Sequence, residues 1–410
     1  MNGLKNYKEF KLIGYDGYFY IFEEGIIFDA NRNVIMIQEE EKPQQYLNKG
    51  KNISENIIQP SGLNNYYGHS CFINAFLQCL INCAPLTKYF LTKYQKTNYT
   101  TLSNIYLDFI KKYQQKDYNA AKGIVNYFLS NDSSIKNTGS DSKDVLFDFF
   151  DKIQSELKHS EISIIIDETT NPENENDVIK ERINLDKADN SIINECFNFW
   201  IENEQKCYNN RCPKYYRNLY EIRSESYFVF YLSEIYNKKY SNYPNNRSGR
   251  RNGNNNKLSL DECFYYYFLE KGNCASCRRV IDVKNKICKL PNILIIVLNR
   301  GKNNYFNVNI EFNQELNLNR YYQKLEYNID EMNHDVSPKY NLLCGTILEK
   351  DYYNPGKGHT IAFATDYHGK YTIYDDNKIK NNEEFQNIKN KDAYILFYQM
   401  EKKILTFQSK

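Results

Sequence analysis

The N-terminal part of the chain shows the two-residue period of β-strands. Over residues 8–38, apolar side chains alternate with polar ones in three runs, and Asp16-Gly17 and residues 29–33 are the turn candidates between them. The pattern predicts a small β-meander. A charged and polar stretch follows it, and we expect that stretch to be a linker that ends at about residue 57.

Helical spacing replaces this alternation from Cys71 onward. The apolar positions of the first run are Phe72, Ala75, Phe76, Cys79 and Leu80. We expect Pro85 to end this helix, and residues 101–130 and 141–157 to be helical as well. Two alternative faces of the last segment fit a core: Phe147, Phe150 and Ile153, or Leu146, Phe149 and Phe150.

Strand-like runs dominate after about residue 190, for example at 227–232, 289–298 and 393–398. Between them, residues 237–257 are rich in Asn, Arg, Ser and Gly. This insert is predicted to be a low-complexity loop, and contact of its basic residues with an acidic partner is the alternative. Because helices come first and strands second, the order predicts an α+β fold.

Composition limits the classes of function. The 41% hydrophobic and 15% aromatic content is enough for a substantial core, and a net charge of +2 gives no reason to expect nucleic acid or a membrane as partner. The N-terminus does not resemble a signal peptide, and the most apolar run, 293–298, is far shorter than the roughly 20 residues of a membrane span. We therefore expect a soluble intracellular protein, in the cytoplasm, the nucleus or both. Eleven cysteines in that setting favour catalysis or metal binding over disulfides.

One cysteine has the surroundings of a nucleophile. Cys71 stands at the start of a helix, where the helix dipole and free N–H groups stabilise a thiolate. His359 can pair with that thiolate and later protonate a leaving amine, and Asp375 can fix the imidazole tautomer. Asp376 is the alternative carboxylate, and if both lie in one strand they point to opposite faces. The set predicts a cysteine hydrolase, although Cys71 taken alone also fits a packed core thiol.

The segments around these residues resemble the ubiquitin-specific proteases, a family of papain-like deubiquitinases. The Cys box of the family is matched by Gly62-Leu63, Asn65, Gly68, Cys71, Phe72, Asn74 and Leu77-Gln78. Its His box is matched by Tyr340-Asn-Leu, Gly358-His359, Asp375-Asp376 and residues 393–398. Residues 290–300 resemble the Leu-Pro strand that lies between the two boxes. The matches run from about residue 60 to 400 and leave out the first 55 residues.

The resemblance implies a papain-like fold over residues 58–401, preceded by the meander of residues 1–57 and followed by a tail at 402–410. The implied subdomains are a helical thumb at about 58–190, zinc-bearing β fingers at about 191–289 and a β palm at about 290–401. It also implies the activity, which is thiol-dependent hydrolysis of the isopeptide or peptide bond after the C-terminal glycine of ubiquitin. Ubiquitin and ubiquitinated proteins are the implied partners.

The Cys box departs from the family pattern near the nucleophile. Tyr66-Tyr67 stand where the family has a single Leu, so Asn65, which resembles the oxyanion-hole asparagine, lies six positions before Cys71 instead of five. Either the loop bulges to restore the amide, or the Cys71 N–H works with another donor. His69 replaces an Asn and is either a competing base or a local loop residue. Thr360 replaces the usual Tyr after the histidine.

Three residues are implied to hold the substrate. Asp141 and Asp144 align with a family block that grips the tail of ubiquitin, and helical spacing puts both on one face. Their carboxylates suit the arginines of that tail, while a solvated acidic turn is the alternative. Gly358 is implied as the third substrate-binding residue.

Two cysteine pairs are typical of a structural zinc site. Cys274 and Cys277 are two residues apart, and Cys207 and Cys212 are four residues apart. A single Cys-x-x-Cys also fits a redox motif, but two pairs in this order match the fingers of the family. We predict packed thiols for Cys196, Cys263 and Cys288, and no organic cofactor.

Two other functions stay open at this point. The first is a catalytically weak or inactive ubiquitin-binding scaffold, which the displaced Asn65 allows. The second is a protease for another ubiquitin-like modifier.

Overall fold

The computed structural model describes residues 10–13, 19–23, 26–28, 34–37, 58–68, 70–131, 142–157, 182, 191–215, 218–240, 257–269, 271–274, 276–301, 306–323, 338–350, 358–366, 368–389 and 392–401. The chain divides into two compact units, Met1–Ile53 and Ser54–Lys410. Within the described residues, no helix has the length and apolar character needed to cross a membrane.

The first unit is a four-stranded antiparallel sheet. Its strands are β1 (Phe10–Ile13), β2 (Phe19–Glu23), β3 (Ile26–Phe28) and β4 (Val34–Ile37), and they pair in chain order. This arrangement confirms the predicted β-meander. The linker predicted to follow it lies outside the described residues.

The second unit begins with helices. They are α2 (Cys71–Ile81), α3 (Ala84–Thr92), α4 (Leu102–Gln114), α5 (Lys122–Asn131), α7 (Ser142–Leu157) and α9 (Ile192–Phe197). Every residue of α2 is buried, which fits its apolar composition on all sides. The buried face of α7 contains Leu146, Phe149 and Phe150, the second of the two predicted alternatives, together with Ile153.

Two helix boundaries differ from the prediction. Pro85 does not end the first helix; α2 stops at Ile81, and Pro85 stands in the first turn of α3, where a missing N–H costs nothing. The segment predicted as one helix over 101–130 is two helices. The chain turns between α4 and α5, and Lys116 in that turn has a left-handed φ of 57°.

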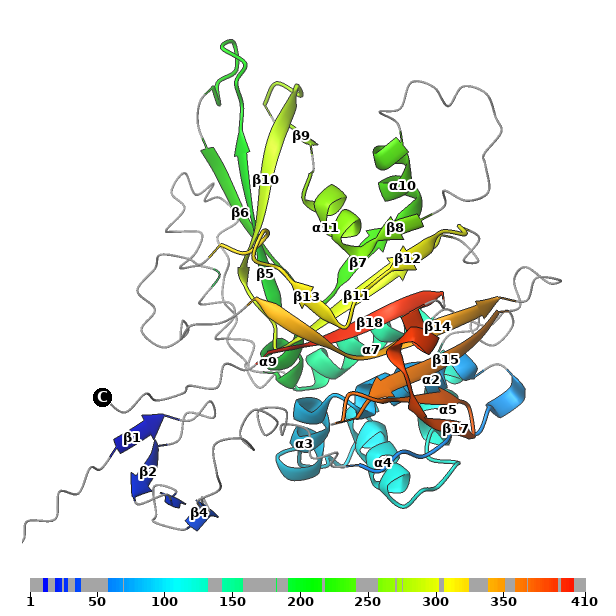
Figure 1. Ribbon diagram of the computed structural model, residues 1–410. Coiled ribbons are helices and arrows are strands. Elements are labelled where there is room, and N and C mark those ends of the chain that lie inside the picture. Colours follow the sequence, from blue (N-terminus) through cyan, green and yellow to red (C-terminus); the bar gives the residue numbers. More distant parts are fainter. Residues whose placement is uncertain are drawn as a thin grey trace, which may run out of the picture. The chain divides into compact units, whose positions relative to one another are not determined.

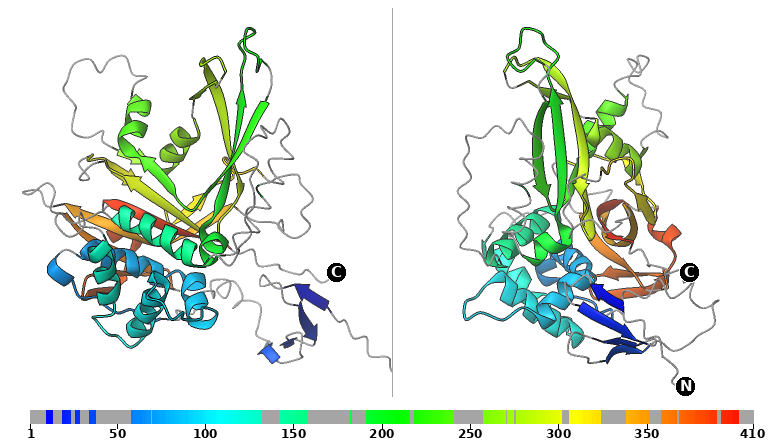
Figure 2. Two further views of the ribbon diagram at one scale, coloured as in Figure 1. Left: turned by 180° about the vertical axis from the view of Figure 1, so that it is seen from behind. Right: turned by 90° about the vertical axis from the view of Figure 1, so that its left-hand side faces the viewer.

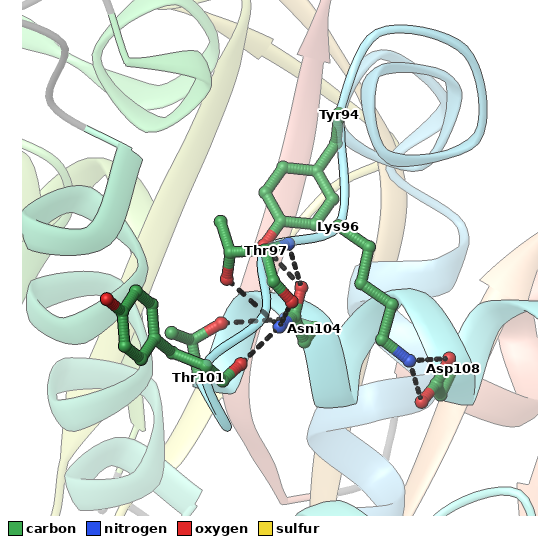
Figure 3. A network of polar contacts seen from close by, with 7 residues as sticks. Tyr94, Lys96, Thr97, Thr101, Asn104 and Asp108 are labelled. Carbon is green, nitrogen blue, oxygen red and sulfur yellow. Dashed lines mark hydrogen bonds and ion pairs between the residues drawn. The ribbon is translucent and has the colours of Figure 1, made fainter.

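A polar network fixes the connection between α3 and α4 (Figure 3). The side chain of Asn104 donates from Nδ2 to the carbonyl of Thr97 (2.9 Å), and its Oδ1 accepts from the Tyr94 hydroxyl (2.8 Å). Lys96 pairs with Asp108 at 2.8 Å. Because a buried amide must satisfy both its donor and its acceptor, Asn104 sets the path of this loop over α4.

The second part of this unit is an eight-stranded sheet. Its order is β17 (Lys378–Glu383), β16 (Tyr371–Asp375), β15 (Gly358–Thr365), β14 (Lys339–Lys350), β18 (Ala393–Met400), β11 (Ile293–Asn299) and β7 (Phe228–Tyr231), with β13 (Glu315–Asn317) also paired to β14. Alternate residues of β11 belong to different hydrophobic clusters, Ile295 to one and Ile296 to the other. Both faces of the sheet are therefore buried, which explains the continuous apolar run of β11.

A second, four-stranded sheet consists of β6 (Asn218–Glu225), β5 (Phe199–Lys206), β10 (Val280–Lys289) and β9 (Lys271–Asn273), in that order. Figures 1 and 2 show its long strands extending away from α2 to α5, which lie together beside the large sheet. This sheet lies within the range predicted for the fingers. Strand β7 also falls in that range, but it pairs in parallel with β11 in the large sheet.

The low-complexity insert is shorter than predicted. Its first residues, Asn237 to Tyr240, complete α10 (Leu232–Tyr240), and Lys257 begins β8 (Lys257–Ser259). Residues 241–256 lie outside the described residues. β8 pairs with β12 (Asn309–Glu311) and leads into α11 (Leu260–Phe268), whose start is closed by a capping box of Ser259 and Glu262. Helices first and strands later confirm the α+β class.

Candidate active site

Cys71 is the first residue of α2. The thiol is reduced, and the residue is only 9% exposed. The first backbone bond of the helix runs from the Asn74 N–H to the Ser70 carbonyl, so the N–H groups nearer the start have no partner within the helix. The positive end of the helix dipole therefore acts directly on the Cys71 sulfur.

His359 links this cysteine to a carboxylate. It is the second residue of β15, and its Nε2 lies 2.6 Å from Oδ1 of Asp375, the last residue of β16. The pKa of His359 is raised to about 9, mainly by its hydrogen bond with Cys71 and further by the bond with Asp375. The three predicted residues thus lie in one line of contacts, from sulfur to imidazole to carboxylate. A raised pKa favours the imidazolium, which is the form that pairs with a thiolate.

The second carboxylate has a different partner. Asp375 and Asp376 do not lie in one strand, so the condition under which they would point to opposite faces is not met. β16 ends at Asp375, and Asp376 follows with a left-handed φ of 51°, which redirects its side chain. Its Oδ2 accepts from Asn65 Nδ2 (2.9 Å) and its Oδ1 from Asn74 Nδ2 (2.8 Å). One carboxylate therefore contacts the imidazole, and the other contacts the loop and helix of the cysteine.

The extra residue before Cys71 is taken up by a turn. Tyr66–Gly68 form a single 3₁₀ turn, in which Tyr67 and Gly68 have left-handed φ values of 59° and 68°. The loop bulges, which is one of the two predicted alternatives. Asn65 Oδ1 accepts from the Ser70 N–H at 2.9 Å, so the amide is held beside the residue that precedes the nucleophile. Its Nδ2 carries two hydrogens, one of which is donated to Asp376.

The same loop is fixed against the turn after β16. The Leu63 N–H donates to the Asp376 carbonyl at 2.9 Å. A Cβ at Gly62 would lie 2.6 Å from the Asn377 carbonyl oxygen, so only glycine fits there. Gln78 on α2 adds a second tie, because its Nε2 donates to the Ser61 carbonyl at 2.8 Å. These contacts explain the Gly and Gln positions of the motif in physical terms.

The predicted substrate-binding residues lie at the edges of this site. Gly358 begins β15 directly before the histidine and is exposed, and a Cβ there would come within 3.0 Å of Leu348. Asp144 lies half exposed in the first turn of α7. Ser142 Oγ donates to the Phe72 carbonyl at 3.2 Å, so this end of α7 is next to the first turn of α2. Asp141 and His69 lie outside the described residues.

Four other cysteines meet at one end of the four-stranded sheet, in the segments that follow β5 and β9. The sulfurs of Cys207 and Cys277 are 3.7 Å apart, as are those of Cys212 and Cys274, and all four lie within 4.8 Å of one another. A tetrahedral Zn²⁺ with sulfurs at about 2.3 Å needs neighbouring sulfurs about 3.8 Å apart, so the set fits this ion. A hydrogen bond from the Asn209 side chain lowers the pKa of Cys277 to about 6, whereas burial raises the pKa of Cys212 to about 12, so a bound cation would be needed to hold all four sulfurs as thiolates.

The cysteines predicted to be packed thiols are buried outside this cluster. Cys196 lies in α9, Cys263 in α11 and Cys288 in β10. Burial raises the pKa of each, to about 12 for Cys263 and Cys288. They are therefore neutral thiols at physiological pH, which agrees with the prediction.

Two polar contacts of the site were not predicted. Asn74 lies one helical turn after Cys71 and joins α2 to Asp376, and its position three residues after the nucleophile was the available signal. Ser70 donates twice to Asn65 Oδ1, from its N–H at 2.9 Å and from its hydroxyl at 3.3 Å. Nothing in the local sequence indicates that Ser70, which precedes α2, also holds the Asn65 side chain.

Comparisons with known proteins agree with this geometry. A family model described as ubiquitin carboxyl-terminal hydrolase matches residues 61–398. Ubiquitin carboxyl-terminal hydrolase 25 of Arabidopsis thaliana is 25% identical over 352 residues, which cover 83% of this chain and 47% of that protein. The chain thus spans about half the length of this curated relative.

Solved structures share the fold. A chain of the Ubp8–Sgf11–Sgf73–Sus1 SAGA DUB module is 17% identical with a TM-score of 0.54, over 93% of this chain and 79% of that one. The same module bound to monoubiquitin gives 16% identity and a TM-score of 0.56, over 94% and 81%. With the family model matched along most of its length, the chain belongs to the ubiquitin carboxyl-terminal hydrolase family.

Proposed function

We propose that this protein is a cysteine deubiquitinase, which hydrolyses the bond after the C-terminal glycine of ubiquitin. The observation that carries the proposal is the line of contacts from Cys71 through His359 to Asp375, in a chain of this family. Among the described residues, the buried thiols of Cys196, Cys263 and Cys288 have no histidine among the groups that shift their pKa. A nucleophile, a base and an orienting carboxylate together are what acyl transfer requires.

In the first half of the reaction, the Cys71 thiolate attacks the carbonyl carbon of the ubiquitin glycine. The resulting tetrahedral intermediate carries a negative oxygen. His359, held by Asp375, protonates the departing lysine amine, and the C–N bond breaks to leave a thioester on Cys71. In the second half, His359 removes a proton from water, which attacks the thioester and frees the ubiquitin carboxylate and the thiol.

Asn65 is the proposed donor to the negative oxygen, together with the Cys71 N–H. Its amide is already oriented, since Ser70 binds its Oδ1 and Asp376 binds one Nδ2 hydrogen. The second Nδ2 hydrogen is the one we assign to the oxyanion. A preorganised donor of this kind contributes more than a mobile one, because it needs no reorientation during the reaction. In this proposal Asp376 acts as a positioning residue.

The tail of ubiquitin is proposed to reach Cys71 past Gly358 and the start of α7. Support for this path comes from the contact between Ser142 and the Phe72 carbonyl, which brings Asp144 close to the first turn of α2. A carboxylate at that point suits a basic tail, and the proposal includes Asp141 for the same reason. Position 358 of the protein itself favours glycine, because a Cβ there would lie 3.0 Å from the Leu348 side chain.

Cys207, Cys212, Cys274 and Cys277 are proposed to hold a structural zinc ion. Four thiolates at tetrahedral spacing leave no open coordination position, so the ion would tie the strands of the fingers together and take no part in the chemistry. All eleven cysteines of the chain are free thiols, which suits a reducing, intracellular compartment. We assign the thumb, fingers and palm to the helices α2–α7, the four-stranded sheet and the eight-stranded sheet.

Incubation of the purified chain with lysine-linked conjugates of ubiquitin, and of other ubiquitin-like modifiers, tests the proposal. We expect release of free ubiquitin and no release of the other modifiers, read by gel and by mass spectrometry. Binding of ubiquitin without cleavage would instead show an inactive scaffold. Cleavage restricted to another modifier would reassign the substrate.

A further inference from the structure

A solvent-open pocket of about 490 Å³ lies beside the candidate active site. Two segments line it, Asn64 to Tyr67 before the cysteine and Asp375 to Lys378 after β16. Both segments reach the reacting groups, since the first contains Asn65 and the second contains Asp375. A molecule bound in this pocket would therefore lie next to residues that act on the bond that is cut.

The order of the large sheet places this pocket on a particular side of His359. β15, which carries the histidine, lies between β16 and β14. The turn after β16 lines the pocket, whereas Gly358, on the proposed path of the ubiquitin tail, pairs with Lys350 on β14. The two halves of a substrate extend in opposite directions from the bond that is cut. The pocket lies on the β16 side of the histidine strand, and this is the side left for the leaving lysine and its polypeptide when the ubiquitin tail follows the path proposed above.

Tyr67 presents its ring at this position. The residue is 66% exposed, although large aromatic residues usually bury most of their surface. Its φ of 59° is a conformation that bulky residues rarely adopt, and such strain persists only where the surroundings impose it.

The neighbours of Tyr67 hold it in place. The Tyr66 N–H donates to Ser70 Oγ at 2.7 Å, and its hydroxyl donates to Asn119 Oδ1 at 2.7 Å. Asn64 donates to the same Asn119 oxygen at 3.0 Å. The exposed ring is therefore attached to a fixed turn and loses little entropy when it contacts a partner.

We propose that Tyr67 is a specificity-determining residue, which contacts the polypeptide around the target lysine on the leaving-group side. The inference rests on the proposed function and adds to it the part of the substrate that is not ubiquitin. An aromatic ring with a polar tip makes favourable contact with the lysine stem and with the peptide beside it. Cleavage of ubiquitin from a polypeptide then depends on Tyr67, in a way that cleavage of a small leaving group does not.

The test compares two ubiquitin substrates in three proteins. One substrate is ubiquitin joined through an isopeptide bond to the lysine of a ten-residue peptide, and the other is ubiquitin ethyl ester, which releases only ethanol. The variants are Tyr67→Asn, which removes the ring while asparagine tolerates the left-handed φ, and Tyr67→Phe, which keeps the ring. The readout is the ratio of kcat/KM for the peptide conjugate to kcat/KM for the ester.

We expect Tyr67→Asn to lower this ratio by about fivefold, mainly through KM for the conjugate, and Tyr67→Phe to keep it within about twofold of the wild type. An unchanged ratio in Tyr67→Asn would overturn the inference, whether both activities fall together or neither falls. A wild-type chain that hydrolyses neither substrate would overturn the proposed function, and this inference with it. Normal ester hydrolysis with an unchanged ratio would overturn the inference alone.

Discussion

Cys71 and the four cysteines of the fingers use the same side chain in opposite ways. At the start of α2, one thiol has an imidazole partner, whose pKa is raised to about 9 by the contact, and a carboxylate behind it. At the end of the four-stranded sheet, four sulfurs lie within 4.8 Å of one another, in a set that contains no histidine or carboxylate. The first arrangement can pass a proton between sulfur and imidazole, whereas the second suits four thiolates that share one cation, as proposed above. The neighbours of a cysteine, more than its burial, decide its chemistry.

Removal of the nucleophile is expected to have the largest effect. Cys71→Ala is expected to lower kcat for a ubiquitin conjugate by at least about 10⁴-fold, because no other group can form the thioester. Affinity for ubiquitin and zinc content should both stay at the wild-type level, since the substitution removes one sulfur beside His359 and leaves the backbone of the palm strands and the four-cysteine cluster in place. Steady-state kinetics, calorimetric titration with ubiquitin and metal analysis give the three readings. Turnover close to that of the wild type would contradict the assignment of Cys71.

The second prediction concerns the oxyanion donor. Asn65→Ala is expected to lower kcat by about 100-fold with little change in KM, because the amide acts on charge that develops only in the transition state. The matched control is Asn119→Ala, which removes a polar contact of the same loop without touching the proposed donor. A larger loss in Asn119→Ala than in Asn65→Ala would show that loop geometry matters and the amide does not.

A third prediction uses pH. The Cys71–His359 pair needs a protonated imidazole, so kcat/KM should fall as the pH rises through about 9, the raised pKa of His359. Asp375→Asn removes one cause of that raised pKa. We expect it to lower kcat/KM by about tenfold near neutral pH and to move the alkaline limb to lower pH. A pH–rate profile that keeps its alkaline limb in the variant would contradict the orienting role of Asp375.

The smallest effect on catalysis is expected in the fingers. Cys274→Ser should remove the zinc and lower Tm by about 5 to 10 °C, while Cys71 keeps its reactivity toward alkylating reagents. Cys288→Ala is the matched control, because Cys288 is buried in the same sheet but lies outside the cluster. That control should lose some stability and retain the metal. Full stability of Cys274→Ser, with no zinc in either protein, would refute the metal site.

Much of the fold followed from the sequence, because local pattern and tertiary role agree there. The apolar positions that follow Cys71 recur at the spacing of a helix. The run at 293–299 is continuous and short, as in a strand buried on both faces. Pro85 was misplaced because proline is equally compatible with the first turn of a helix and with the region after its end. The break near Lys116 has no Gly or Pro to signal it, and its left-handed φ belongs to the cap that ends α4, where the Lys116 and Asp117 N–H groups donate to the Tyr113 and Lys112 carbonyls.

The main residues of the candidate site were also predictable from the sequence. Cys71, His359 and Asp375 were identified from their chemistry and motif order, and the structure brings them together. The contacts of Asp376 were not predictable, because its positive φ comes from the turn after β16 and not from its own residue type. The path of Tyr66-Tyr67 was left as two alternatives, since a one-residue insertion has no preferred geometry outside its surroundings.

The most direct test of the central claim is the reaction of the purified chain with a ubiquitin electrophile, followed by intact-mass and peptide mapping. We predict one adduct with the mass of one ubiquitin, located on Cys71 and absent from Cys71→Ala, with the four finger cysteines unmodified. An adduct on any other cysteine, or a folded wild-type chain that forms none, would contradict the account.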